Sequence, residues 1–341
     1  LKQKFSDLGV DVKEDDTMDI TGHGAGNLIC TLKGTKQTDT IYFTSHMDTV
    51  VPGNGVKPVV ENGYVKTDGT TILGADDKAG LAAMFEAIKV LKEENIEHGT
   101  IEFIITVGEE SGLIGAKALD RSMITASYGY ALDSDGKVGN IIVAAPTQAK
   151  VRAAIFGKTA HAGVEPEKGI SAITIASKAI SKMPLGRIDE ETTASIGRFE
   201  GGTQTNIVCD EVHILAEARS LVPEKMEAQV QKMKAAFEEA AADMGGRAEV
   251  EIEVMYPGFK YQDGDQVVEI AKKAAAKIGR PSELQTSGGG SDANVIAGHG
   301  IPTVNLAVGY EQIHTKNEKM PIEELVKTAE MVVAIIEEAA K

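Results

Sequence analysis

Apolar residues in the first 145 positions alternate between the spacing of strands and the spacing of helices. Ile41–Ser45 is apolar and rich in strand-forming residues, and Ile101–Val107 is a continuous apolar run typical of a strand buried on both faces. Between them, Asp77–Asn95 carries apolar residues at every third or fourth position, which predicts a helix. With a further short strand at Tyr128–Leu132, this order predicts an α/β fold with a mostly parallel sheet flanked by helices.

A different order of elements follows Pro146. Strands and helices are expected in the order β-α-β-β-α-β, which is typical of a ferredoxin-like α+β unit. The predicted elements are Lys150–Phe156, Gly169–Met183, Ala194–Phe199, Val212–Ala218, Pro223–Met244 and Ala248–Tyr256. This segment is long enough to form a domain of its own.

The α/β pattern resumes after Pro257. The predicted elements are a helix over Gln266–Ile278, a strand at Thr303–Ala307 and a final helix from Ile322. We therefore predict an α/β catalytic domain, residues 1–147 and 258–341, that is interrupted by an inserted ferredoxin-like lid domain, residues 148–257. The length of 341 residues agrees with two domains or with one domain that carries a large insertion.

The charge balance and the cysteine count narrow the range of partners and compartments. Thirty-five basic and 51 acidic residues give a net charge of −16, which argues against nucleic acid or an anionic membrane as a partner. No apolar run approaches the 18 residues of a membrane-spanning helix. Cys30 and Cys209 form no disulfide framework, so we expect a reducing compartment, the cytoplasm. The chain starts at Leu1 inside a helical pattern, and we expect a further segment before it.

Acidic residues and histidines gather where predicted strands end. These endings are Ser45-His46-Met47-Asp48, Gly74-Ala75-Asp76-Asp77, Gly108-Glu109-Glu110, Leu132-Asp133 and Ile313-His314. Each ending alone has an ordinary explanation, such as a loop histidine, a helix-capping aspartate or a solvated turn. Five endings in one sheet are harder to dismiss, because ligands bind at the carboxyl ends of the strands in open parallel sheets.

This mixture of imidazoles and carboxylates suits zinc, which binds nitrogen and carboxylate oxygen at about 2.0–2.2 Å. Two histidines and three carboxylates are too few for two separate closed sites, but they suffice for two ions if one carboxylate bridges. On an extended backbone, His46 and Asp48 point the same way, so Asp48 can hold the far nitrogen of His46. Glu109 and Glu110 point in different directions, so one can bind metal while the other stays free as a base.

Over nearly its whole length the chain resembles the di-zinc exopeptidases and amidohydrolases that include peptidase T, carboxypeptidase G, aminoacylase and succinyl-diaminopimelate desuccinylase. The peptidase T-like branch is the most similar in detail. The resemblance is carried by Ser45-His46-Met47-Asp48-Thr49-Val50, Gly74-Ala75-Asp76-Asp77-Lys78-Ala79-Gly80, Thr106-Val107-Gly108-Glu109-Glu110-Ser111-Gly112 and Gly157-Lys158-Thr159-Ala160-His161-Ala162-Gly163.

The resemblance implies a role for each polar strand ending. Two divalent ions are implied, zinc first, with cobalt or manganese as options. Asp76 would bridge the two ions, and the other metal ligands would be His46 and Asp133 for one ion and Glu110 and His314 for the other. Glu109 would be the general base. Asp48, as the residue that holds His46, is a further predicted catalytic residue. The resemblance also implies a cis peptide bond between Asp76 and Asp77.

The lid and one glycine-rich turn also match family positions. His161 corresponds to a histidine that reaches the reacting carbonyl, and Asn206 and Arg219 correspond to a pair that binds a substrate carboxylate. Peptidase T does not carry that arginine, so a terminal carboxylate becomes an alternative handle; the other interpretation of Arg219 is a surface ion pair. Gly289, in the turn that opens a short helix, offers a backbone amide to substrate, although a plain flexible turn explains it nearly as well.

The predicted function is therefore a zinc-dependent exopeptidase that hydrolyses an amide bond of small peptides. Two alternatives stay open: an aminoacylase-type deacylase acting on N-acyl amino acids, and a metal-binding or receptor-like protein of the same fold without turnover. The expected partners are small substrates, and a homodimer through the lid is a further option that the sequence does not decide.

Overall fold

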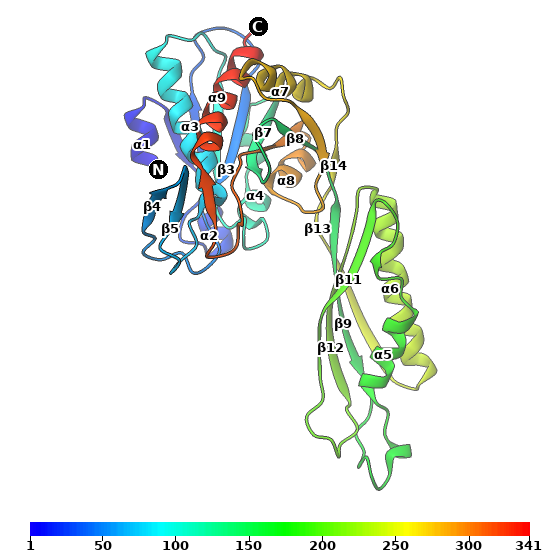
Figure 1. Ribbon diagram of the computed structural model, residues 1–341. Helices are drawn as coiled ribbons and strands as arrows, with labels where there is room; N and C mark the ends of the chain where they lie inside the picture. Colours follow the sequence, from blue (N-terminus) through cyan, green and yellow to red (C-terminus); the bar gives the residue numbers. More distant parts are fainter. The chain divides into compact units, whose positions relative to one another are not determined.

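The computed structural model describes residues 1–341, and the chain divides into two compact units. Unit 1 comprises Leu1–Ala144, Lys260–Ser287 and Ser291–Lys341, and unit 2 comprises Ala145–Phe259 and Gly288–Gly290. Figure 1 shows unit 1 in blue through green and again in gold through red, because the chain leaves it and later returns.

Unit 1 is built on a nine-stranded sheet in the order β1-β2-β6-β3-β7-β16-β8-β14, with β15 paired to β8. The strands are β1 (Asp11–Glu14), β2 (Leu28–Leu32), β3 (Ile41–His46), β6 (Ile101–Thr106), β7 (Tyr128–Ser134), β8 (Asn140–Ala145), β14 (Phe259–Lys260), β15 (Glu283–Thr286) and β16 (Thr303–Ala307). The central strands β6, β3, β7 and β16 are parallel to one another, while β1 and β2 add an antiparallel edge. The predicted mostly parallel sheet is confirmed.

Helices cover both faces of this sheet. On one face, the core that contains Phe43 and Phe103 includes residues of α3 (Ala75–Glu93), α7 (Gln266–Lys277) and α9 (Ile322–Ala339). On the other, Tyr42 and Ile104 pack with residues from α8 (Asp292–Gly298) and from the segment after α4 (Ile114–Ala118). Neighbouring residues of one strand thus enter opposite cores, which explains the uninterrupted apolar runs.

The remaining elements of unit 1 are short. They are α1 (Lys2–Asp7), α2 (Thr17–Thr21), a 3₁₀ turn at Arg121–Met123, and a three-stranded sheet of β4 (Pro58–Glu61), β5 (Tyr64–Thr67) and β17 (Lys319–Pro321). The sequence analysis predicted none of the strands β1, β2, β4, β5, β8, β14, β15 and β17. Most of these strands have two to five residues, too few for a period to be visible. No helix in either unit combines the length and the apolar character needed to span a bilayer.

Unit 2 is an antiparallel sheet with helices on one face (Figure 1). Its elements are β9 (Thr147–Phe156), α5 (Ala172–Lys182), β10 (Gly186–Arg187), β11 (Thr192–Gly201), β12 (Glu211–Ser220), α6 (Pro223–Asp243) and β13 (Arg247–Tyr256), with a 3₁₀ turn at Pro166–Lys168. The strand order β10-β11-β12-β9-β13 contains the predicted ferredoxin-like arrangement, and β10 is an addition at its edge.

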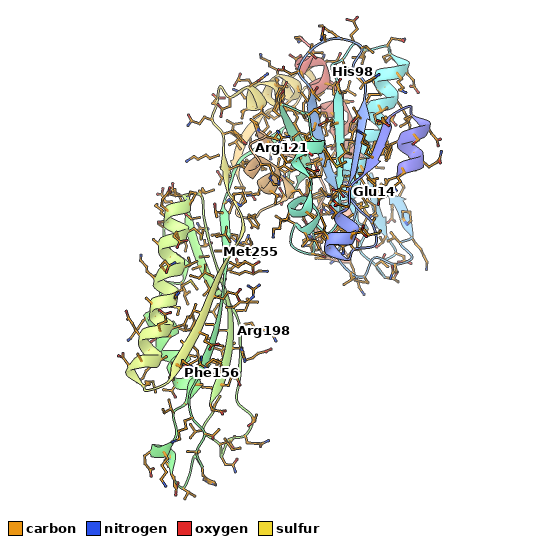
Figure 2. All side chains as sticks on the ribbon, turned by 180° about the vertical axis from the view of Figure 1, so that it is seen from behind. Glu14, His98, Arg121, Phe156, Arg198 and Met255 are labelled. Carbon is orange, nitrogen blue, oxygen red and sulfur yellow. The ribbon has the colours of Figure 1, made fainter.

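One face of the sheet in unit 2 is apolar and the other is charged. Along β12, Val212, Ile214, Ala216 and Ala218 are buried against α5 and α6, while the residues between them are more exposed. On β11, Arg198 forms an exposed ion pair with Glu200 (Figure 2). This alternation is that of a strand with one solvated face.

Candidate metal centre and active site

Seven of the predicted site residues lie in unit 1, at the carboxyl ends of its parallel strands. These residues are His46, Asp48, Asp76, Glu109, Glu110, Asp133 and His314. His46 ends β3, Asp133 lies near the end of β7, and Glu109 and Glu110 follow β6. Asp76 lies in the first turn of α3. His314 comes from the loop between β16 and β17, so segments that are distant in sequence supply the site.

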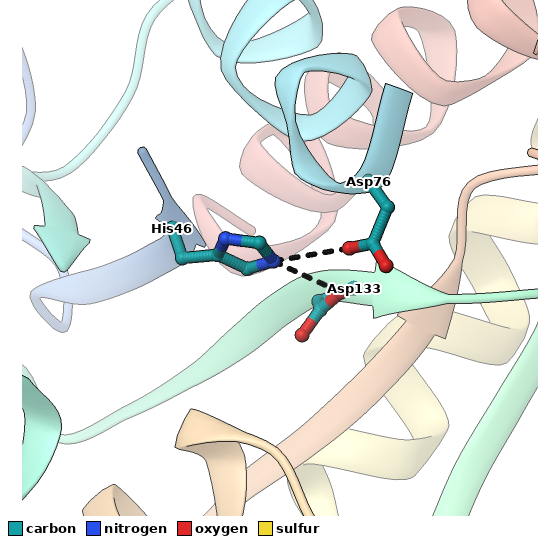
Figure 3. Close-up of side chains that lie close together, drawn as sticks. All are labelled: His46, Asp76 and Asp133. Atoms are coloured by element: carbon teal, nitrogen blue, oxygen red, sulfur yellow. Dashed lines mark hydrogen bonds and ion pairs between the residues drawn. The ribbon is translucent and has the colours of Figure 1, made fainter. Parts of the chain in front are cut away.

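Asp76 faces two histidines with its two carboxylate oxygens. Its Oδ1 lies 3.0 Å from Nε2 of His46, and its Oδ2 lies 3.1 Å from Nε2 of His314. Asp133 Oδ1 is 3.8 Å from the same His46 nitrogen (Figure 3), and Glu110 Oε1 is 3.0 Å from the same His314 nitrogen. The side chains therefore form two donor groups that share Asp76. The peptide bond after Asp76 is cis, as predicted.

The composition of these two groups fits divalent cations. The groups are His46, Asp76 and Asp133, and Asp76, Glu110 and His314; in each, the nitrogen and oxygen atoms that could bind an ion lie within 4.8 Å of one another. Glu110 Oε1 is buried without a hydrogen bond, although it lies 3.0 Å from His314. A buried carboxylate oxygen without a hydrogen-bond donor is costly unless a cation compensates for it.

The electrostatics of the cluster indicate the same need for positive charge. Burial raises the pKa of Asp133 well above its usual value, and the neighbouring Asp76 adds to the shift. Burial, followed by the charge of Asp133, raises the pKa of Glu109 to about 10. For His46, burial lowers the pKa, but hydrogen bonds to Asp48 and Asp76 outweigh it and the pKa is raised well above normal. Since bound cations favour ionised carboxylates, a pair of divalent ions would relieve this excess of buried negative charge.

Asp48 makes more contacts than the sequence predicts. The atom nearest to Nδ1 of His46 is the main-chain oxygen of Asp48, at 2.9 Å, whereas Oδ1 of its carboxylate lies at 3.5 Å. The carboxylate also accepts hydrogen bonds from the backbone N–H groups of Glu109 and Glu110, both at 3.1 Å. Asp48 thus connects the His46 strand end to the turn that carries the two glutamates.

Glu109 lies close to the possible metal ligands but belongs to neither of the two donor groups that share Asp76. Its carboxylate is within 4.8 Å of the ligand atoms of His46 and Glu110. The turn that carries it begins at Gly108, whose φ of 63° is in the left-handed region; a side chain there would also overlap the ring of His23. The glycine therefore lets the chain turn sharply at the end of β6, which places successive glutamates side by side.

The other predicted site residues, His161, Asn206, Arg219 and Gly289, belong to unit 2. His161 and Asn206 lie on neighbouring segments, since the N–H of Ala162 donates to the carbonyl oxygen of Asn206. Arg219 lies at the opposite end of β12, whose 10 residues span about 30 Å at roughly 3.3 Å per residue. Within one unit 2, the predicted pair of Asn206 and Arg219 is therefore too far apart to bind one carboxylate together.

Arg219 is already paired. Its Nε donates to Oε1 of Glu217 at 2.8 Å, its Nη2 approaches Oε2 of the same carboxylate at 3.3 Å, and its Nη1 donates to the carbonyl oxygen of Gly288 at 3.1 Å. The sequence allowed two interpretations of Arg219, a contact to a substrate carboxylate and an ion pair within the protein. The observed geometry is that of the ion pair.

Three supporting residues escaped the sequence analysis. Tyr310 donates its hydroxyl to Oδ1 of Asp133 at 3.0 Å, and Nδ2 of Asn305 donates to the main-chain oxygen of Asp133 at 2.6 Å. Glu318 accepts hydrogen bonds from the segment before Asp76. The only signal for Tyr310 and Glu318 was proximity in sequence, since each lies four residues from His314.

The chain matches a known protein family over most of its length. The sequence pattern of the peptidase family M20/M25/M40 matches residues 42–338. The chain belongs to this family. Within peptidase family M20/M25/M40, the crystal structure of aminopeptidase PepT from Bacillus cereus ATCC 10987 is similar with a TM-score of 0.97. It is 79% identical, and the match covers 100% of this chain and 91% of that one.

Two further proteins are similar over nearly the whole chain. A tripeptidase structure from Staphylococcus aureus subsp. aureus Mu50 has a TM-score of 0.97 and 54% identity, over 99% of this chain and 91% of that one. Uncharacterized protein YqjE of Bacillus subtilis (strain 168) is 99% identical over 100% of this chain and 92% of its own length. The chain is therefore a hydrolase of the peptidase T-like branch, as predicted.

Proposed function

We propose that this chain is a di-metal aminopeptidase that removes the first residue of short peptides, tripeptides foremost. The observation that carries the proposal is Asp76, whose two oxygens face His46 and His314 separately while Glu109 lies beside them. Such an arrangement can hold two cations around one carboxylate and leave a second carboxylate for proton transfer. The similarity to an aminopeptidase and to a tripeptidase supports the substrate class.

In this proposal, His46 and Asp133 would hold one ion, Glu110 and His314 would hold the other, and Asp76 would contribute to both sites. Two divalent ions supply Lewis acidity, which lowers the pKa of water from 15.7 towards about 7 and polarises a carbonyl oxygen. Glu109 accepts a proton as the water oxygen bonds to the peptide carbonyl carbon. It returns that proton to the leaving nitrogen when the carbon–nitrogen bond breaks. Asp48 keeps Glu109 and Glu110 in place through their backbone amides.

The test is hydrolysis of a substrate panel by the purified protein. Tripeptides, dipeptides and N-acetyl amino acids are compared before chelation, after chelation and after Zn²⁺ is restored. We expect tripeptides to be cleaved fastest at the first bond, with loss of activity on chelation and recovery with metal. Faster cleavage of N-acetyl amino acids would favour a deacylase, and no turnover of any substrate would favour a silent metal-binding protein.

Zinc is the proposed ion because two imidazoles and three carboxylates match its preference for nitrogen and oxygen ligands. Metal analysis of protein purified without added metal measures which ion is present and how many per chain. Asp76→Asn is the matched variant, since it keeps the shape but removes the charge that both donor groups share, and it should lower the content of both ions.

A terminal carboxylate handle built on Arg219 would favour the carboxypeptidase and aminoacylase branches. Because Glu217 already pairs with Arg219, the structure gives no specific support for that handle. We retain His161 as the proposed group that stabilises the oxyanion, and Asn206 and Gly289 as proposed substrate contacts. A His161→Ala variant that lowers kcat with little change in metal content would support the first of these.

Two expectations about the molecule in the cell belong to the same proposal. Cys30 and Cys209 are both free thiols, which agrees with a cytoplasmic location, and cell fractionation checks it. A homodimer through residues 148–257 is proposed from the sequence, and light scattering coupled to size exclusion measures the mass.

A further inference from the structure

The tight loop that carries His314 also contains a buried glutamate, Glu318. The backbone N–H and C=O groups of Glu311 and Lys319 pair with each other at 2.9 and 3.0 Å and close the base of this loop. Inside it, Gln312 and His314 have positive φ values of 56° and 60°, which are unfavourable for side-chain-bearing residues. The loop therefore holds a specific shape that its own sequence does not favour.

Packing holds this end of the loop only through Ile313, which is partly buried against the core of unit 1. The side chain of His314 is 51% exposed, whereas Glu318, four residues later, is 2% exposed. A half-exposed histidine has room to adopt other rotamers, so another contact must fix the loop relative to Asp76 and Glu110.

Glu318 makes that contact. Its Oε2 accepts hydrogen bonds from the backbone N–H groups of Leu73 and Gly74, both at 2.7 Å, and its Oε1 accepts one from the N–H of Asp76 at 3.0 Å. Hydrogen bonds to an ionised acceptor are among the strongest in proteins, and three of them converge here on one buried carboxylate. The residue that donates the last of these bonds, Asp76, is the one that both donor groups share.

We propose that Glu318 is a positioning residue that joins the His314 loop to the Asp76 segment and so sets the spacing between those two metal-binding side chains. The inference rests on the proposed metal centre and deepens it. Glu318 does not lie among the residues that could hold an ion. Its effect on metal binding is therefore exerted through Asp76 and His314.

The conservative variant Glu318→Gln separates positioning from mere space filling. Glutamine has the same shape but only one oxygen. If this oxygen accepts from Leu73 and Gly74, the side-chain NH₂ group meets the N–H of Asp76, donor against donor. The anchor next to the shared carboxylate is then lost while the rest of the loop keeps its packing.

Glu102 provides a matched control. It is also 2% exposed, and its carboxylate accepts hydrogen bonds from the N–H groups of Thr125 and Ala126 and from the hydroxyl of Thr125. Glu102 lies near the start of β6, whereas Glu109 and Glu110 follow its end. Glu102→Gln thus disturbs a buried carboxylate of the same kind that lies away from the metal centre.

The experiment titrates Zn²⁺ into metal-free wild-type protein, Glu318→Gln and Glu102→Gln, in competition with a chelator, and measures kcat and KM on a tripeptide. We expect Glu318→Gln to lower the affinity for at least one Zn²⁺ by about 10- to 100-fold, the usual effect of losing a residue that orients metal ligands. We expect kcat at limiting Zn²⁺ to fall with KM nearly unchanged, and Glu102→Gln to leave the Zn²⁺ affinity as in the wild type. Glu318→Asp, which keeps both oxygens, should recover part of the affinity.

The outcomes distinguish this inference from the proposed function. Wild-type protein that binds no Zn²⁺ overturns the proposed function. Wild-type protein that binds two ions, together with Glu318→Gln that binds them equally tightly, overturns the inference alone. If neither variant folds, amide hydrogen exchange on wild-type protein decides: Zn²⁺ should slow exchange at Leu73–Asp76 and at 314–318 together. Slowing in only one of the two segments contradicts the link.

Discussion

Several single side chains in this protein contact two or more segments of the chain at the same time. Asp76 faces two histidines, and Asp48 contacts His46 while it accepts the backbone amides of Glu109 and Glu110. Asn27 is completely buried; its Nδ2 donates to Asp15, Thr17 and the carbonyl oxygen of Gly115, and its Oδ1 accepts from the N–H of Val107. Loss of such a residue therefore affects more than one segment.

Glu109→Gln is the first residue-scale prediction. Glutamine keeps the shape of the side chain but cannot accept and return a proton, so we expect turnover to fall by about 10²- to 10⁴-fold. Both ions should remain, because Glu109 is not in either donor group that shares Asp76. Steady-state kinetics and metal analysis measure the two effects, and near-normal turnover would remove Glu109 from its proposed role.

Asn27→Ala is the second residue-scale prediction. The change leaves the N–H of Val107 and the carbonyl oxygen of Gly115 without a partner in the interior. At about 1–3 kcal/mol for each of these two unsatisfied groups, we expect the free energy of unfolding to fall by roughly 2–6 kcal/mol. Urea denaturation measures it, with the exposed Asn54→Ala as a control. A loss no larger than that of the control would contradict this account.

The sequence could predict these residues only where chemistry and position coincide. Histidines and carboxylates at strand ends stand out, because no apolar core explains them, and the structure brings His46, Asp76, Asp133 and His314 together. Glu318 and Asn27 resemble ordinary loop residues in the sequence. Their partners are backbone amides of distant segments, and no pattern of residue types records those contacts.

At the scale of elements, periodicity predicted long segments well and short ones poorly. The predicted helix Asp77–Asn95 corresponds to α3, and the predicted strand Ala248–Tyr256 to β13. By contrast, β1 has no buried residue and β14 has only two residues, so neither shows an alternation that could be detected. Length and burial decided which elements were visible in the sequence.

The start of α5 gives an element-scale prediction. Oγ of Ser171 accepts a hydrogen bond from the N–H of Thr174 at 3.2 Å and so caps the first turn. Ser171→Ala should lower the free energy of unfolding by about 0.5–2 kcal/mol. Ser181 lies near the other end of the same helix and bonds only to Lys178. Ser181→Ala is therefore expected to change stability by less than about 0.5 kcal/mol in the same urea titration. Equal effects of the two changes would show that the cap does not contribute.

For the whole molecule, the two units have separate hydrophobic cores. The core around Phe43, Phe103 and Tyr130 lies in unit 1, and the core around Phe237 and Met233 lies in unit 2. The proposed metal ligands all belong to unit 1. Metal binding should therefore stabilise the two units unequally.

Chelation tests this at the scale of the molecule. A ligand present at 100 times its dissociation constant stabilises the state that binds it by about 2.7 kcal/mol. Removal of metal should therefore speed amide hydrogen exchange in the strands of unit 1 and leave β9, β12 and β13 of unit 2 nearly unchanged. Equal acceleration in both units would contradict the assignment of all metal ligands to unit 1.

The interruption of unit 1 by unit 2 also has a consequence for biosynthesis. Asp133 leaves the ribosome 181 residues before His314, so translation at about 5–20 residues per second separates the two by roughly 10 to 40 seconds. During that interval the nascent chain holds His46, Asp76 and Asp133 but lacks the histidine of the second donor group. An ion that binds early would find only one of the two donor groups complete. The second group can form only after the segment that carries His314 has been synthesised and has folded onto the sheet.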